Sequence, residues 1–332
     1  MATATPEAAA PGPQEVVADE SSRRTPAGVA AILAGLLTIG VSIYAGVLAA
    51  DRPVVTIVET LAPLVNTGGP PEVSPRVVAL RYQVDTAFDQ VLSSVLSALG
   101  LLAGGFALRF LIRAARHRKL EIPAFLPTAV LIGALALGIV TVIVTIIRLE
   151  NARDFLAAED RSPAAFEELG SGLPPGPVSS VLLVALFVLA FGYVYGALNA
   201  MRVGLLTRFM GVLGIIVGAA LILGSVLPFA GSGFPLVQAF WLIGLGLIYL
   251  DRWPGGVPPA WNAGEARPWP TQLELREARD RERLERAGAA PSAEPDAGPQ
   301  RTREPVDAPP ATEPRAPART HPSSKKKKRK RR

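Results

Sequence analysis

Apolar residues are concentrated in six long runs between residues 27 and 250. An α-helix needs about 20 apolar residues to cross the roughly 30 Å hydrocarbon core of a bilayer, and each run is near or above that length. In lipid, every backbone N–H and C=O must be satisfied within its own segment, so such spans are helices. The pattern therefore predicts an all-α, polytopic membrane protein with six transmembrane helices, over residues 27–50, 91–112, 123–147, 177–201, 209–230 and 233–250.

Basic residues lie on alternate connections between the predicted spans. Arg23 and Arg24 precede the first span, and further basic residues follow the second and fourth spans. The connections at 51–90 and 148–176 carry more acidic than basic residues. Because positive charge beside span ends is retained in the cytoplasm, we expect both termini to be cytoplasmic and these two connections to lie outside. The basic residues after spans two and four are Arg109, Arg113, Arg116, Arg118, Lys119, Arg202 and Arg208.

The twin arginines, followed by an apolar run and Leu48-Ala49-Ala50, faintly resemble a cleaved secretory signal. That run is longer than the usual apolar region of about 7–15 residues, so a retained first span is favoured. Arginine is used throughout, whereas only Lys119 lies outside the final basic run, which is typical of a GC-rich bacterial genome. We therefore expect a multi-pass protein of a bacterial plasma membrane.

Both ends of the chain are polar. Residues 1–26 and 288–332 are too poor in apolar surface to offset the entropy of ordering, so we expect disordered cytoplasmic segments there. Residues 271–287 alternate acids and arginines, with i, i+4 pairs such as Glu277–Arg281, and predict a charged helix.

The juxtamembrane segment 251–270 holds three of the four tryptophans, Trp253, Trp261 and Trp269, in a stretch too rich in Pro and Gly for a helix. Tryptophan prefers the headgroup region of a bilayer, so we interpret them as membrane-interface anchors. Two alternatives stay open. The segment could be a docking strip for a partner, or a plug folded under the bundle.

The chain ends in an uninterrupted basic run. Its eight charges account for more than the whole net charge of +6, so the residues before it sum to −2. Near an anionic membrane each basic residue contributes about 1 kcal/mol, so anionic lipid headgroups are the expected partner. Nonspecific contact with RNA or the ribosome is the alternative. The run consists of Lys325, Lys326, Lys327, Lys328, Arg329, Lys330, Arg331 and Arg332.

The sequence offers little chemistry. There is no cysteine, and the six charge-free runs (the second taken as Val91–Leu108) contain no Asp, Glu, Lys, Arg or His. No metal-binding, serine-histidine or phosphate-cradling motif is present, so we expect neither an enzyme nor a cofactor. Serine and threonine usually bond back to their own helix, which leaves Asn199 and Gln238 as the candidate intramembrane polar residues. They lie near opposite membrane faces, so we expect two packing residues and not one site.

Glycine pairs at i, i+4 recur in the spans: Gly100 and Gly104, Gly192 and Gly196, and Gly214 and Gly218. Such pairs let helix backbones approach closely in a membrane. We expect packing within one bundle, with a homo-oligomer as the alternative.

Spans four to six carry the motifs Asn199–Gly214, Gln238–Trp241 and Arg252–Gly256, the first with a Gly-Leu-Leu-x-Arg-x-x-Gly-x-x-Gly core. Over residues 195–275 the chain resembles uncharacterised multi-span integral membrane proteins of high-GC actinobacteria. The resemblance implies a bacterial plasma-membrane protein. That family is a domain of unknown function, so it implies no functional residue.

The sequence thus favours a non-enzymatic scaffold or accessory component of the lipid bilayer, with a polybasic cytoplasmic arm. The first rival is a transporter or channel for a small neutral or apolar solute, which needs no buried charge and would be favoured by a cavity near Asn199 or Gln238. The second is an insertase-like protein whose basic tail contacts the ribosome.

Overall fold

The computed structural model describes residues 12–53, 75–119, 121–158, 176–226, 234–269 and 272–288. It divides into two compact units, Met1–Thr271 and Gln272–Arg332. All regular structure in the described ranges is α-helical. The helices of the first unit are α1 (Pro13–Ala50), α3 (Pro75–Asp85), α4 (Ala87–Arg118), α5 (Leu126–Ala157), α7 (Pro177–Arg202), α8 (Arg208–Val226), α9 (Phe234–Tyr249) and α10 (Pro259–Ala263).

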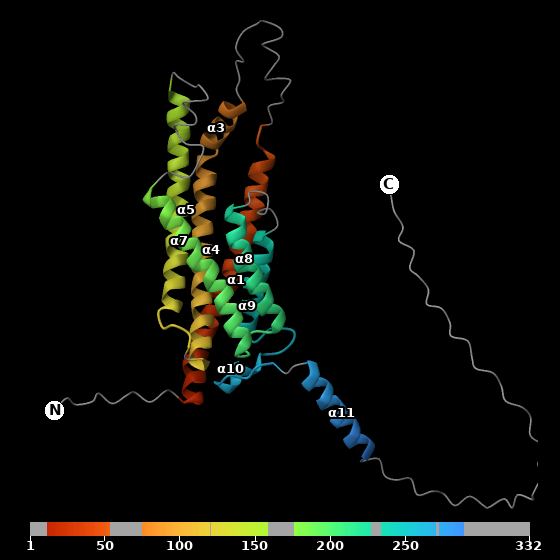
Figure 1. Cartoon of the computed structure of the whole chain (residues 1–332). Helices are drawn as coiled ribbons and strands as arrows, with labels where there is room; N and C mark the ends of the chain where they lie inside the picture. Colours follow the sequence, from red (N-terminus) through yellow and green to blue (C-terminus); the bar gives the residue numbers. More distant parts are fainter. Residues whose placement is uncertain are drawn as a thin grey trace, which may run out of the picture. The chain divides into compact units, whose positions relative to one another are not determined.

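Six of these helices form a closed ring. Each packs on the next in chain order, α1 on α4, α4 on α5, α5 on α7, α7 on α8 and α8 on α9. α9 then packs on α1 and closes the ring, and α4 also contacts α7 across it (Figure 1). We call the end of the bundle at which α4 ends and α10 lies the α10 end, and the opposite end the α3 end.

Four helices, α1, α4, α5 and α7, are long and apolar enough to cross a membrane. α8 and α9 are also apolar but shorter, and residues 227–233 between them lie outside the described residues. The predicted all-α, multi-span membrane fold is confirmed to that extent, with four candidate spans and two shorter apolar helices in the described chain.

The predicted disorder of residues 1–26 is wrong from Pro13 onward, because α1 begins there. Pro13 occupies the first turn, where its missing N–H costs nothing, and the Glu15 carboxylate accepts a hydrogen bond from the Gly12 N–H at 3.2 Å. The turns that follow bury Val16 and Glu20. Tertiary contacts of these turns therefore stabilise a helix that composition alone did not predict.

Two other helices exceed their predicted spans. α4 runs from residue 87 to 118 where 91–112 is predicted, and α5 runs to Ala157 where 147 is predicted. The α5 extension carries charged residues on one side and buries Leu149, Ala152 and Phe155 on the other, where α3 packs against it. An amphipathic extension of this kind ends the charge-free run without ending the helix.

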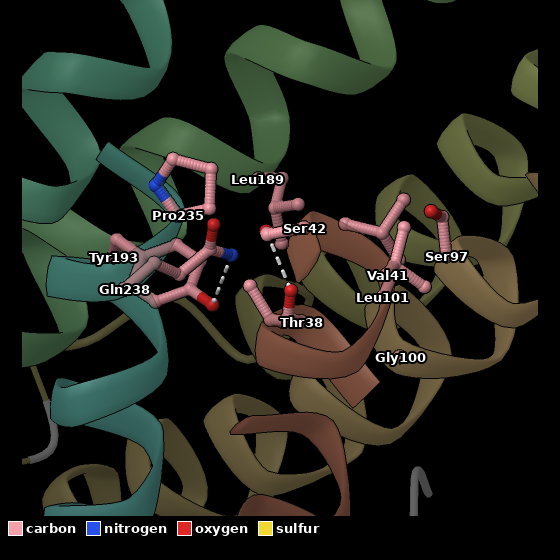
Figure 2. Close-up of a pocket in the computed structure, with 10 residues that line it drawn as sticks. All are labelled: Thr38, Val41, Ser42, Ser97, Gly100, Leu101, Leu189, Tyr193, Pro235 and Gln238. Atoms are coloured by element: carbon pink, nitrogen blue, oxygen red, sulfur yellow. Dashed lines mark hydrogen bonds between the residues drawn. The ribbon is translucent and has the colours of Figure 1, made fainter. Parts of the chain in front are cut away.

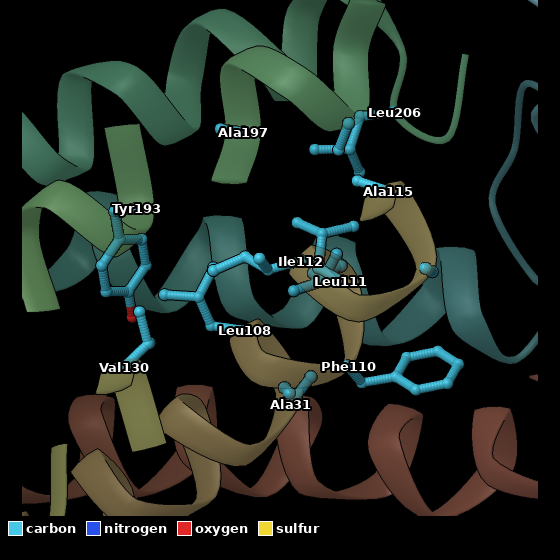
Figure 3. Close-up of a cluster of buried hydrophobic side chains, with 14 of the residues drawn as sticks. Ala31, Leu108, Phe110, Leu111, Ile112, Ala115, Val130, Tyr193, Ala197 and Leu206 are labelled. Atoms are coloured by element: carbon cyan, nitrogen blue, oxygen red, sulfur yellow. The ribbon is translucent and has the colours of Figure 1, made fainter. Parts of the chain in front are cut away.

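The core is centred on the second half of α4. Leu108, Leu111 and Ile112 are fully buried. Figure 3 shows them between Ala31 of α1 on one side and Tyr193 of α7 on the other. The second half of α4 thus supplies much of the buried core at the α10 end.

The glycine pairs lie against neighbouring helices of this bundle. A Cβ on Gly192, Gly196, Gly214 or Gly218 would lie 2.6–2.9 Å from atoms of neighbouring helices, including Val130, Ile112 and Ala197. Gly100 and Gly104 face α1 at ordinary contact distance. These glycine faces are covered by the chain's own helices and do not offer an exposed surface for a second copy.

The second unit contains α11 (Gln272–Gly288), close to the charged helix predicted over 271–287. Its ion pairs include Glu282–Arg286 at 2.6 Å and the predicted Glu277–Arg281 at 4.0 Å. Both pairs are exposed, so each contributes about 0.3–0.5 kcal/mol.

Candidate functional site

The linker between α7 and α8, residues 203–207, is buried although it is not helical. Val203, Leu205 and Leu206 are at most 3% exposed. Backbone carbonyls removed from water in this way need hydrogen-bond partners. The partners come from the segment after α9, residues 251–269, which we call the cap.

The cap is joined to the linker by three hydrogen bonds of 3.0 Å. The indole Nε1 of Trp261 donates to the Leu205 carbonyl, and that of Trp269 donates to the Leu206 carbonyl. The Arg267 N–H donates to the Val203 carbonyl. These bonds satisfy a buried loop and hold the cap against the bundle.

The interface-anchor prediction is therefore wrong for Trp261, which is 2% exposed and stacks on Phe110 of α4. Trp253 and Trp269 are half-buried against the protein. Pro259 opens the short helix α10, where no helix is predicted, because Pro is compatible with a first helical turn. The observed arrangement corresponds to the alternative of a segment folded under the bundle.

Beside Trp261 lies a buried ion pair. Arg118 donates to both carboxylate oxygens of Glu20, at 2.6 and 2.8 Å, and also to the Ala260 carbonyl of the cap, at 2.8 and 3.1 Å. The Arg118 side chain is fully buried, and that of Glu20 is 4% exposed. One guanidinium group thus connects α1, α4 and the cap.

A second arginine completes the junction. Arg24 donates to the Ile248 carbonyl at 2.9 Å and pairs with Asp251. The guanidinium carbons of Arg24 and Arg118 lie 4.8 and 5.5 Å from the Trp261 ring centroid, within the range of cation–π attraction. From the sequence, Arg24 and Arg118 indicate only which ends of the predicted spans lie in the cytoplasm, and no structural role for either side chain is predicted. Nothing in the sequence links residues 20 and 24 of α1 with residue 118 of α4 and residue 251 of the cap.

Burial alone would raise the pKa of Glu20, but His117, whose Nδ1 lies 3.4 Å from the carboxylate, and the hydrogen bonds and charge of Arg118 outweigh burial and lower it. A carboxyl group whose pKa is lowered on folding stabilises the fold above its ordinary value near 4.5, and this contribution is lost as the pH falls through the lowered pKa. The charge of Glu20 also acts on the Arg24 guanidinium, which pairs with Asp251.

We therefore expect Glu20→Gln to be less stable than the unaltered protein by about 2 kcal/mol at pH 7, and this difference to shrink below about pH 4.5. The measurement is the free energy of unfolding of both proteins in detergent between pH 7 and 3. A difference that stays constant across that range would show that the Glu20 charge does not hold the junction.

The bundle also contains a pocket of about 250 Å³ between α1, α4, α7 and α9, with a few polar groups on a largely apolar lining. Figure 2 shows the Gln238 amide beside the Tyr193 hydroxyl, with Thr38 and Ser42 of α1 across from them. The Gln238 Nε2 donates to the Tyr193 hydroxyl at 3.4 Å. The pocket is lined by Thr38, Val41, Ser42, Ser97, Gly100, Leu101, Leu189, Tyr193, Pro235 and Gln238.

The two polar candidates from the sequence have different surroundings. Asn199 is 2% exposed, and its Nδ2 donates to the Tyr195 carbonyl of its own helix at 2.9 Å, so it is a packing residue. Gln238 lines the pocket. Sequence reasoning identified Gln238 but missed Thr38, Ser42 and Tyr193, because the three come from two other helices.

The basic run Lys325–Arg332 lies outside the described residues. Within the described part of the chain, no three His, Asp or Glu side chains gather where they could hold a metal ion. No protein-family model, curated protein or solved structure matches this chain.

Proposed function

We propose that this protein is a non-enzymatic scaffold or accessory component of a bacterial, actinobacterial-type plasma membrane, with the α10 end and both termini in the cytoplasm. The orientation is supported by the basic residues Arg23, Arg24, Arg113 and Arg118 at the α10 end, since positive charge is retained on the cytoplasmic side. In this arrangement the bundle anchors a charged arm, residues 272–332.

The observation that carries the proposal is the attachment of the cap to the bundle. Its hydrogen bonds to the linker, together with the contacts of Arg118 and Arg24, hold residues 251–269 in a fixed place. The arm follows directly in the chain. A membrane scaffold requires an arm whose starting point is fixed. The distance that the arm can span from the bundle is then set by the length and stiffness of the arm alone.

The partner that we propose for the arm is an anionic lipid surface, contacted by Lys325–Arg332. Eight basic charges at about 1 kcal/mol each would suffice for stable, salt-sensitive binding. RNA or ribosome contact is the alternative, and the two are separated by the following experiment.

The full-length protein and a variant lacking Lys325–Arg332 are reconstituted in neutral nanodiscs, and added vesicles or purified ribosomes are titrated across a salt series. We expect the full-length protein to bind anionic vesicles, to lose binding as salt rises, and to ignore neutral vesicles. A variant lacking residues 305–312 of the Pro/Ala linker, equal in length to the basic run, serves as the control and should bind normally. Ribosome binding that needs the tail at physiological salt would replace this proposal with a role in membrane-protein biogenesis.

A second candidate function, transport of a small neutral solute, is favoured by the pocket at Gln238. Toward the α10 end the bundle is packed with buried side chains such as Trp241, Leu245 and Trp261. A solute could therefore cross the membrane only if the cap moved away and the helices at the α10 end separated.

A further inference from the structure

The hydroxyl groups of the pocket are oriented by their own helix. The Thr38 Oγ1 donates to the Ala34 carbonyl at 2.8 Å, and the Ser42 Oγ donates to the Thr38 carbonyl at 2.7 Å. Each hydroxyl has one donor and two acceptor lone pairs. Because both donors are used within α1, these two side chains present acceptors to the pocket.

The opposite wall adds to this pattern. The Gln238 amide donates to the Tyr193 hydroxyl, which leaves the amide oxygen as a further acceptor and the Tyr193 O–H as a donor (Figure 2). The rest of the lining is largely apolar, with Val41, Leu101 and Leu189 among its residues. The pocket therefore offers three hydrogen-bond acceptors and the Tyr193 donor on an otherwise largely apolar surface, a set that a hydroxyl group, which both donates and accepts, matches better than an ether oxygen.

None of the ten residues that line the pocket in the described part of the chain is Asp, Glu, Lys, Arg or His. A charged ligand placed there would leave water without gaining an ionic partner, at a cost of several kcal/mol. An uncharged ligand with a hydroxyl or N–H donor would instead gain hydrogen bonds that an ether or hydrocarbon of the same size cannot make.

We propose that this pocket binds a small uncharged molecule with an apolar body and at least one hydroxyl or N–H donor. This names the ligand class for the second candidate function and rests on the same pocket. Binding does not require transport, and the proposed scaffold function does not depend on it.

The test uses the absence of cysteine from the chain, which allows a single thiol to be placed in the pocket by Ser97→Cys. The full-length variant is reconstituted, and the rate of its modification by N-ethylmaleimide is measured with 1-hexanol or its isomer 1-methoxypentane present. One hydrogen bond contributes about 1 kcal/mol, so we expect hexanol to protect the thiol at a concentration about fivefold lower than the ether.

Gly40→Cys on the exposed face of α1 is the matched control, since both probes also dissolve in the bilayer. Its labelling should be unaffected by either probe. Adding Thr38→Val and Ser42→Ala to the Ser97→Cys variant removes two of the three acceptors and should reduce the preference for hexanol. The shift in unfolding temperature that each isomer causes in the cysteine-free protein provides a second measurement if the triple variant folds poorly.

Equal protection of Ser97→Cys by the two isomers would overturn the proposal, as would protection of Gly40→Cys by hexanol. This outcome leaves the tail-dependent binding of vesicles untouched, because that binding is measured with different variants and without probes. Failure of the tail experiment would likewise leave the pocket result standing.

Discussion

Replacement of Arg118 by methionine is expected to lower the free energy of unfolding by about 3–5 kcal/mol. Methionine retains much of the length of the side chain but removes the partner of the buried Glu20 carboxylate and the donor to the Ala260 carbonyl. An unpaired buried charge costs more than the ion pair contributed, which is why the effect is large. The measurement is denaturant unfolding of the purified full-length protein in detergent, followed by tryptophan fluorescence.

Arg113→Met is the matched control, because Arg113 lies on the same helix and pairs with Asp19 at 3.2 Å but is 37% exposed. Its expected cost is below about 1 kcal/mol. A double variant, Glu20→Gln with Arg118→Met, removes both charges and should recover part of the loss. If Arg118→Met proves no more destabilising than Arg113→Met, the buried pair does not hold α1, α4 and the cap together.

Gly204→Ala is expected to destabilise the protein by about 3 kcal/mol. Gly204 has a φ of +84°, which costs an alanine about 1–2 kcal/mol. Its Cβ would also overlap the Arg267 carbonyl oxygen of the cap, and moving backbone aside adds about 1–3 kcal/mol. The cap should detach from the linker, so we expect faster proteolysis within residues 251–269 as well as easier unfolding.

Gly256→Ala separates the two contributions. Gly256 has a similar φ of +81°, but no atom lies within 4 Å of the position that its Cβ would take. This variant should lose only the conformational part, about 1–2 kcal/mol, and its cap should resist protease as in the unaltered protein. Equal effects of the two alanines would mean that the close approach of cap and linker does not matter for stability.

The membrane-spanning body could be predicted from sequence because its signal is local. Apolar runs free of charge specify helices in lipid whatever their neighbours are, and serines and threonines such as Thr38 and Thr141 bond back to their own helix as expected. The helix ends were harder to place. α5 continues through Arg148 and Glu150 because one face stays apolar after the charge-free run has stopped.

The junction at the α10 end could not be predicted in the same way. Glu20 lies in a polar stretch that has the composition of a disordered segment, and Arg118 lies in a basic connection. Glu20 and Arg118 meet only because α1 packs on α4 in the closed ring, and no periodicity in the sequence indicates which helices become neighbours. The prediction that the three cap tryptophans lie at the membrane interface rests on the preference of an isolated indole for the headgroup region. In the structure, buried carbonyl groups of the linker accept hydrogen bonds from two of these indoles.

The closure of the ring by α1 and α9 has a consequence for synthesis. About 180 residues separate the end of α1 from the start of α9, so at about 5–20 residues per second the ribosome completes α1 roughly 10–40 s before its neighbour exists. During that interval the α9-facing side of α1, including Gly28 and Gly35, is open to lipid or to another protein. The nascent chain therefore passes through an open, incomplete bundle, and the ring closes only when α9 has been made.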